Sequence, residues 1–256
     1  MKYKIGFIGA GKMAEGILCA VKNRRSVIMA EKLEERIDYL KKRYRVKVVT
    51  DVGEVVKNSQ YIIVAVKPQD VESLSGQVKP YLSKEQTVVS IAAGKSLRNL
   101  RRCFGSKAKI IRVMPNLALR AGAGMCVLTS HDEFIEGVLS AAGETLVLPE
   151  KHFDAVTALS GSGPAYFAFM QQAMAAAAMK LALPKAAALK LSAQTMYGTA
   201  KFLKETGCEL GAFIAGVCTK GGTTAAGMRF LEDSDFTSVV ARTIKGASDR
   251  SRELNG

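Results

Sequence analysis

Short apolar runs rich in β-branched residues alternate with helix-like patterns through the first half of the chain. Between the second and third runs, Leu33, Ile37, Leu40 and Tyr44 recur at offsets of 4, 3 and 4, which places them on one face of a helix. Continuous apolar strands that alternate with such helices are typical of a parallel sheet covered on both faces. We expect strands at residues 4–8, 27–31, 46–49, 61–66, 87–92, 109–114, 125–129 and 145–148.

The pattern changes after Pro149. Val, Ile and Thr give way to Ala, Met, Leu and Lys, and strand-like runs no longer occur. An α/β half followed by an all-helical half predicts two domains, residues 1–149 and 150–256. We expect helices at residues 151–159, 164–181, 185–205, 210–217, 224–232 and 236–254. Met170, Met174 and Met179 are expected to fill a helical core or a dimer interface rather than to contact a ligand.

Length and composition narrow the class of protein. The chain has 256 residues, of which 48% are hydrophobic and 23% charged, and this ordinary globular usage excludes wholesale disorder. No apolar run approaches the roughly 18 residues that a membrane span needs, and the N-terminus lacks a signal-peptide pattern, so we expect a cytoplasmic protein. The five cysteines are scattered, and His131 and His152 have no acids or thiols at ligand spacing. We therefore expect neither a disulfide framework nor a metal site.

The net charge of +14 suggests an anionic partner, and its distribution is uneven. Residues 1–50 hold 13 Lys and Arg against 5 Asp and Glu. Such a segment suits a phosphorylated cofactor, and it also leaves open a non-catalytic nucleotide-binding or nucleic-acid-binding protein. No nucleic-acid motif accompanies it, and aromatic residues make up only 7% of the chain. Much of the excess is expected on a solvated helix face that carries Arg36, Lys41, Lys42, Arg43 and Arg45.

The first strand leads directly into a G-x-G-x-x-A pattern that opens a helix. Gly9 permits the tight turn, Gly11 lets the backbone approach a pyrophosphate at the helix N-terminus, and Ala14 allows helix and strand to pack closely. Any tight turn can use glycines, but here the strand, the helix and the alternation behind them agree. The loop predicts dinucleotide binding through residues Gly9, Ala10, Gly11, Lys12 and Met13.

The choice between NADH and NADPH is read at the end of the second strand. Glu31 lies there, 22 positions after Gly9, followed by Lys32. A carboxylate accepts hydrogen bonds from an unmodified ribose and repels a 2′-phosphate, yet the surrounding segment is basic. Glu31 can also be read as an acid that stabilises the next helix N-terminus. The sequence leaves the preferred nicotinamide cofactor open, and both Glu31 and Lys32 are candidate cofactor contacts.

Three further junctions lie where ligands collect in doubly wound sheets, past the carboxyl ends of strands. Each alone is read as a simple strand end, but three at one edge predict a cleft. The small residues Ala92 and Ala93, at the second of these junctions, would leave room for a flat nicotinamide. Lys67 either approaches the cofactor or lies in solvent. The candidate cofactor contacts at these junctions are Val66, Lys67, Pro68, Ala92, Ala93, Met114, Pro115 and Asn116.

These motifs, together with two in the second half, closely resemble the pyrroline-5-carboxylate reductase family. The specific ones are Gly161-Ser162-Gly163-Pro164-Ala165-Tyr166 and Gly221-Gly222-Thr223-Thr224-Ala225-Ala226-Gly227, and the match covers essentially the whole chain. The resemblance implies an N-terminal Rossmann domain, NADPH or NADH as cofactor, and a helical C-terminal domain that interlocks with a second subunit. It also implies reduction of 1-pyrroline-5-carboxylate to L-proline. Some members of the family assemble further, into rings of dimers.

The resemblance also assigns the substrate site. The loop from Thr219 to Thr224 offers consecutive backbone N–H groups at a helix start, which suits an anionic carboxylate. By resemblance, the N–H groups from Gly221 through Gly222 and Thr223 to Thr224 hold the substrate carboxylate. The Thr224 hydroxyl is the catalytic group that hydrogen-bonds the ring nitrogen, and Glu150 contacts substrate. Without the resemblance, Gly221-Gly222 would be read as a helix end and Thr223 as the next helix cap.

The chain departs from the family pattern at several positions. Thr219-Lys220 replaces the usual Ser-Pro, Gln172 replaces a glutamate, and Val52 replaces a frequent asparagine after the third strand. These changes concern substrate range and adenosine contacts. A β-hydroxyacid dehydrogenase or another imine reductase would share the architecture. Such dehydrogenases carry a catalytic lysine on the long helix of the second domain, and here that helix has no lysine before Lys180.

Overall fold

The computed structural model describes residues 1–255, and the chain divides into two compact units. The first, here called the sheet unit, comprises residues 1–162 together with the chain from Lys245 onward. The second, here called the helical unit, comprises Gly163–Ile244. The helical unit thus begins 13 residues after the expected start at residue 150, because Phe153 is fully buried in the core of the sheet unit. The domain boundary at residue 149 stays a prediction.

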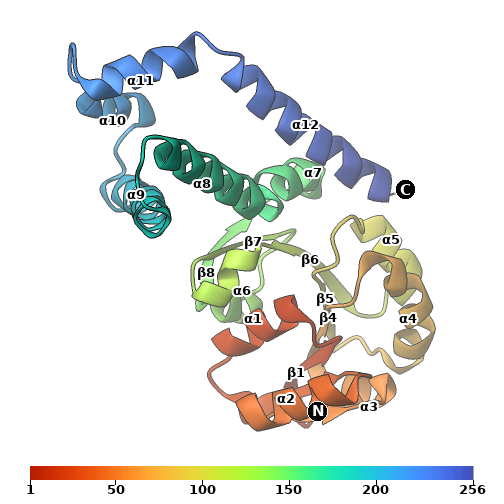
Figure 1. Cartoon of the computed structure of the whole chain (residues 1–256). Coiled ribbons are helices and arrows are strands. Elements are labelled where there is room, and N and C mark those ends of the chain that lie inside the picture. The colour runs from red at the N-terminus through yellow and green to blue at the C-terminus, as the bar shows by residue number, and fades with distance from the viewer. Residues whose placement is uncertain (256) are drawn as a thin grey trace. The chain divides into compact units, whose positions relative to one another are not determined.

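The sheet unit is built on one eight-stranded sheet in the order β3-β2-β1-β4-β5-β6-β7-β8. Neighbouring strands from β3 to β6 pair in parallel, and the order of these six is that of the doubly wound dinucleotide-binding fold. The predicted α/β fold class is confirmed (Figure 1). The strands are β1 (Tyr3–Ile8), β2 (Val27–Ala30), β3 (Lys47–Val49), β4 (Ser59–Val64), β5 (Thr87–Ser90), β6 (Lys109–Pro115), β7 (Gly124–Leu128) and β8 (Gly143–Val147).

The apolar pattern alone predicts a sheet that is parallel throughout. The observed sheet is mixed. Strand β7 runs antiparallel to β6, and β8 then pairs in parallel with β7. The connection between β6 and β7 spans residues 116–123 and contains only a 3₁₀ turn, Leu117–Ala121. A parallel crossover needs about a dozen residues or more, so this short connection reverses the strand direction.

Helices cover both faces of the sheet, as predicted. Alternate residues of β4 show the arrangement, because Tyr61 and Ile63 belong to one buried apolar cluster, and Ile62 and Val64 belong to the other. Helices α1 (Lys12–Ala20), α2 (Glu34–Tyr44) and α6 (Glu133–Ser140) contribute to the first cluster. Helices α3 (Val52–Asn58), α4 (Val71–Val78) and α5 (Leu97–Phe104) contribute to the second. The short helix α7 (Phe153–Val156) follows β8 and leads into a π-helical turn, Thr157–Gly161.

The helical unit contains no strand among its residues and buries little of its own surface. Its helices are α8 (Gly163–Lys180), α9 (Lys185–Thr206), α10 (Leu210–Val217), α11 (Thr223–Glu232) and the first part of α12 (Phe236–Asn255). Helices α8 and α9 pack against each other, yet Ala175 and Ala188 are the only apolar side chains buried in this unit. Met170, Met174 and Met179 are between 36% and 49% exposed, so they do not fill a core within one chain. No described helix is long and apolar enough to cross a membrane.

Candidate active site

The turn between β1 and α1 has the geometry that its glycines predict. Gly9 has a φ of +86°, and a Cβ there would lie 2.8 Å from the Ala65 carbonyl oxygen. Gly11 is the N-cap of α1, and a Cβ there would have no neighbour within 4 Å. The backbone of Gly11 is therefore open to an approaching ligand, beside the first-turn N–H groups of α1. This turn fits the pyrophosphate of a dinucleotide, with Lys12 exposed at the start of the helix.

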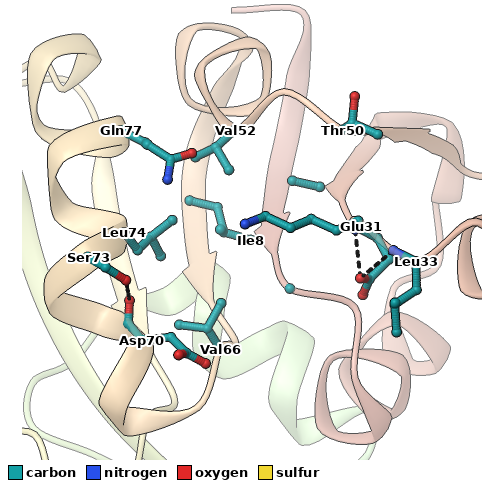
Figure 2. A pocket seen from close by; sticks show the side chains of 13 residues that line it. Ile8, Glu31, Leu33, Thr50, Val52, Val66, Asp70, Ser73, Leu74 and Gln77 are labelled. Carbon is teal, nitrogen blue, oxygen red and sulfur yellow. Dashed lines mark hydrogen bonds between the residues drawn. The ribbon is translucent and has the colours of Figure 1, made fainter.

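A pocket of about 390 Å³ lies at the carboxyl ends of the central strands, beside this turn. Figure 2 shows Ser73, Leu74 and Gln77 of α4 on one side of it and Glu31 and Leu33 on the other. Of the predicted cofactor contacts, Gly9, Glu31, Lys32 and Val66 line this pocket, and Val52 also lines it, at the position of the family's asparagine. Lining residues that the sequence reasoning missed are Ile8, Ala30, Leu33, Thr50, Asp70, Ser73, Leu74 and Gln77.

The Glu31 carboxylate is fixed by three backbone N–H groups. Its Oε2 accepts from Ala10 N at 3.2 Å, and its Oε1 accepts from Lys32 N at 2.7 Å and Leu33 N at 3.2 Å. Leu33 is the N-cap residue of α2, so the carboxylate also supports the start of that helix. The sequence allows two roles for Glu31, a cofactor contact and an acid at a helix N-terminus. The structure is compatible with both, because the side chain lies on the pocket wall and also stabilises the start of α2.

Arg36 is not on a solvated face, contrary to the sequence prediction. Its Nε donates to the Ala10 carbonyl oxygen at 2.8 Å, and its Nη2 donates to Glu15 Oε2 at 2.6 Å. The hydroxyls of Tyr39 and Tyr44 donate to Glu15 Oε1 at 2.8 and 2.6 Å. The sequence hides this network because Glu15 lies on α1, at least 21 residues from each partner.

The network keeps Glu15 ionised. Glu15 is only 4% exposed, and burial alone would raise the pKa of its carboxyl group. The hydrogen bonds from Tyr44, Arg36 and Tyr39 outweigh burial and lower that pKa to about 2. The phenol of Tyr44 is affected in the opposite sense, since burial and its bond to Glu15 raise its pKa. An ion pair between Glu15 and Arg36 therefore supports the glycine turn from behind, through Ala10.

The other predicted cofactor residues lie along the same sheet edge, mostly without a free polar side chain. Lys67 is exposed, and Pro68 begins the 3₁₀ turn that follows it. Ala92 and Met114 are buried, while Ala93 is half-buried beside Met114. Pro115 is buried at the end of β6, and Met13 is half-buried against the core. These positions supply shape and small size rather than hydrogen bonds.

The side-chain amide of Asn116 makes its hydrogen bonds within the chain. Its Oδ1 accepts from Ala118 N and Met125 N, both at 3.2 Å, and its Nδ2 donates to Ser160 Oγ at 3.4 Å. The side chain thus caps the turn after β6 and ties that turn to β7 and to the π-helical segment. Its amide fixes the end of β6, which is a structural task that the sequence reasoning did not assign.

Glu150 pairs with a buried arginine. Its Oε1 accepts from Arg112 Nη1 at 3.1 Å and from Leu97 N, at the start of α5, at 2.6 Å. Arg112 is 2% exposed and its guanidinium lies 4.8 Å from the centre of the Phe153 ring. Burial lowers the pKa of Arg112, and the bond to Glu150 opposes this. The predicted substrate contact of Glu150 stays a prediction, and the structure adds a packing role for its carboxylate.

The double-glycine loop joins α10 to α11 in the helical unit. Gly221 has a φ of +75°, and Gly222 is the N-cap of α11 without a side-chain cap. Gly222 N donates to the Thr219 carbonyl oxygen at 2.9 Å, and a Cβ on Gly222 would lie 2.5 Å from Thr219 Oγ1. Within the described chain, the N–H groups of Thr223 and Thr224 have no acceptor. The loop therefore presents free N–H groups at the positive end of a helix dipole.

Two family models match the chain, one in each half. The description of the first is "Pyrroline-5-carboxylate reductase dimerisation", and it matches residues 150–254. The description of the second is "NADP oxidoreductase coenzyme F420-dependent", and it matches residues 4–94. Helices α8 to α11 thus fall within a domain known for subunit association, and the strands from β1 to β5 fall within a nucleotide-dependent oxidoreductase domain. The helical C-terminal half is in this way linked to formation of homo-oligomers.

Relatives and solved structures agree with both models. The chain is 38% identical to the pyrroline-5-carboxylate reductase of Synechocystis, covering 99% of both chains, and 38% identical to that of Arabidopsis thaliana, covering 99% and 96%. The solved structure of the enzyme from Coxiella burnetii matches over 100% of both chains with a TM-score of 0.92 and 27% identity. The structure from Plasmodium falciparum, with NADP bound, matches over 100% of both chains with a TM-score of 0.88 and 26% identity. The chain belongs to the pyrroline-5-carboxylate reductase family.

Proposed function

We propose that this protein reduces 1-pyrroline-5-carboxylate to L-proline with NADPH or NADH, the last step of proline biosynthesis. The observation that carries the proposal is the pair of free N–H groups of Thr223 and Thr224 at the start of α11. A cyclic imino acid needs such a binding group for its carboxylate. The glycine turn and the 390 Å³ pocket of the sheet unit support the dinucleotide side of the reaction.

The reaction depends on orientation of the substrate more than on covalent catalysis. A protonated imine is already an electrophile, and the reduced nicotinamide supplies the hydride that adds to its carbon. The C=N π electron pair then moves to the ring nitrogen, which becomes the secondary amine of proline. The N–H groups of Gly221, Thr223 and Thr224 hold the carboxylate, while that of Gly222 stays bonded to the Thr219 carbonyl oxygen, and the Thr224 hydroxyl accepts a hydrogen bond from the ring nitrogen. These two contacts fix which atom of the substrate is presented for reduction.

The cofactor-binding part of the proposal uses the turn and the sheet edge. Gly9, Ala10, Gly11, Lys12 and Met13 would hold the pyrophosphate through first-turn N–H groups, since Gly11 leaves its backbone open. The lining residues Glu31, Lys32 and Val66 would contact the adenosine half. The residues Lys67, Pro68, Ala92, Ala93, Met114, Pro115 and Asn116 would border the nicotinamide half. For Asn116 this contact would come beside its bonds within the chain.

The subunit arrangement in this proposal is an interlocked homodimer. The helical unit leaves large apolar side chains uncovered, among them Phe169 at 72% and Phe230 at 81% exposed. A groove of about 750 Å³ between α8 and α9, lined partly by Phe169 and Leu189, offers room for apolar side chains of a second copy. Exposed apolar surface on this scale marks an association surface. Rings of dimers and a cytoplasmic location, in keeping with five free cysteines, complete the proposal.

A substrate panel tests the proposal directly. Oxidation of NADH and of NADPH would be followed with 1-pyrroline-5-carboxylate and, in parallel, with a set of 2-keto and 3-keto acids. We expect turnover with the cyclic imine and formation of proline, measured by chromatography. Turnover only with the keto acids would overturn the proposal in favour of a hydroxyacid dehydrogenase.

A further inference from the structure

We infer that the adenosine end of the dinucleotide site selects NADH over NADPH, because Glu31 is held on the pocket wall and Arg36 is bound elsewhere. This inference rests on the proposed function and concerns the 2′ position of the adenosine ribose. NADPH carries a phosphate there, and NADH carries a hydroxyl. The selecting residues are Glu31, directly after β2, and the group formed by Glu15, Arg36, Tyr39 and Tyr44 behind the glycine turn.

Glu31 is held in one position at the pocket. Its carboxylate lies on the wall of the pocket (Figure 2). Three N–H groups, from Ala10, Lys32 and Leu33, hold it there. These bonds prevent the side chain from swinging away when a 2′-phosphate approaches. They also leave Oε2 with a single donor, so that it can accept a further bond from a ribose hydroxyl. A fixed carboxylate therefore attracts the hydroxyl and repels the phosphate.

Arg36, the next arginine along the chain after Glu31, has its charge already paired. Arg36 follows Glu31 by five positions and lies on α2, where an arginine that receives a 2′-phosphate would be expected. Its Nε and Nη2 are bound by the Ala10 carbonyl and by Glu15. Glu15 stays ionised because Tyr39 and Tyr44 add hydrogen bonds to it, which hold its pKa at about 2. Turning Arg36 toward a phosphate would leave the buried Glu15 carboxylate without its counter-charge.

The pocket itself carries a net negative charge. Its charged lining residues are Glu31, Asp70 and Lys32, which sum to a net charge of −1. Lys32 is exposed, and its backbone N–H donates to Glu31. A single solvated ammonium group attracts a doubly charged phosphate only weakly. It does not outweigh the repulsion between that phosphate and the fixed carboxylate. The basic character of residues 1–50 therefore does not extend to the wall that faces the ribose.

Equilibrium binding tests the selection without any substrate. Dissociation constants of NADH and NADPH would be measured with the full-length protein at one ionic strength, by quenching of dinucleotide fluorescence and by calorimetry. We expect NADH to bind at least about tenfold more tightly, which corresponds to roughly 1.4 kcal/mol. Equal affinities, or tighter binding of NADPH, would overturn the inference. Since binding needs no imine, a failure to turn over 1-pyrroline-5-carboxylate would overturn the proposed function alone.

Two variants separate the roles of the two residues. In Glu31→Ser, we expect NADPH to gain about tenfold relative to NADH, whereas the matched control Glu35→Ser, which removes an exposed acid outside the pocket, leaves the ratio unchanged. In Arg36→Met, we expect both dinucleotides to weaken alike, because the loss acts through Ala10. A selective loss of NADPH binding in Arg36→Met would show that Arg36 receives the 2′-phosphate and would overturn the inference. Thermal unfolding confirms that each variant is folded.

Discussion

The sheet unit and the helical unit differ in how much apolar surface one chain covers by itself. In the sheet unit, two clusters fill both faces of the sheet, and Phe7 and Phe104 are at most 1% exposed. In the helical unit, Phe167 and Phe169 are 64% and 72% exposed, although α8 and α9 pack against each other. Hydrophobic burial is the main stabilising term in folding, so the sheet unit has a complete core and the helical unit does not. The comparison indicates that the helices reach their stable state only against a second copy.

The largest expected effect follows from breaking the association surface. Phe169→Glu places a charge on the α8–α9 groove, so we expect a monomer in light scattering, a partial loss of helical circular dichroism, and activity at least about 100-fold lower. Binding of NADH should persist, because the pocket lies wholly within the sheet unit. The control Tyr81→Glu changes a side chain that is 42% exposed on the sheet unit and should keep the native mass and activity. A Phe169→Glu protein with native mass and native turnover would refute the comparison.

The next effect concerns the reaction within the helical unit. Thr224→Ala should lower kcat about 100-fold, because the ring nitrogen loses its hydrogen-bond partner. The dissociation constant for NADH should stay unchanged, since Thr224 belongs to the helical unit and the pocket to the sheet unit. Thr224→Ser keeps the hydroxyl and should recover most of the turnover. Loss of NADH binding with intact kcat would contradict the assigned role.

Two glycine variants in the turn between β1 and α1 separate ligand binding from stability in the sheet unit. Gly11→Ala should leave stability within about 0.5 kcal/mol of the parent, because its φ is −67° and a Cβ there has open space. It should nevertheless weaken NADH binding about tenfold or more, since the added methyl stands where the pyrophosphate must approach the backbone. Calorimetry and urea unfolding measure the two quantities.

Gly9→Ala is the matched comparison for that test. Its φ of +86° and the 2.8 Å approach to the Ala65 carbonyl make any side chain strained there, so we expect a loss of stability of about 1–3 kcal/mol together with weaker binding. If Gly11→Ala lost as much stability as Gly9→Ala, the open backbone at Gly11 would not be a ligand site.

The sequence predicts the elements well because their signals are local. The apolar period of Leu33, Ile37 and Leu40 gives α2, and continuous apolar runs give strands that are buried on both faces. The direction of β7 was missed although the chain holds the information, since the short connection 116–123 excludes a crossover. The glycine turn was predicted because its residue types are dictated by backbone geometry.

The rest of the site depends on contacts between distant residues. Arg36 reads as a solvated cation until Glu15 is brought to it, and no local pattern shows that the Asn116 amide oxygen accepts from Met125 N. The end of α12 returns to the sheet unit, where Ser251 Oγ donates to Asp154 Oδ1, a pair 97 positions apart. No local pattern encodes such pairs. The exposed apolar helices could be predicted only as a core or an interface, and exposure in the single chain distinguishes the two.

The smallest expected effect is one of stability at Glu150. In Glu150→Gln, the buried Arg112 loses a counter-charge that is itself 30% exposed, while the amide oxygen can still accept its hydrogen bond, so we expect the free energy of unfolding of the sheet unit to fall by about 1 kcal/mol. Urea unfolding followed by circular dichroism measures it, with Glu133→Gln as an exposed control in the same unit. An unchanged unfolding midpoint would show that the pair contributes nothing to the fold.

The most direct test of the account is a crystal structure of the assembled protein with oxidised dinucleotide and L-proline bound. We predict a homodimer in which the proline carboxylate accepts hydrogen bonds from the N–H groups of Thr223 and Thr224, with the Thr224 hydroxyl at the ring nitrogen. Proline bound away from this loop, with those N–H groups in contact only with solvent, would contradict the account.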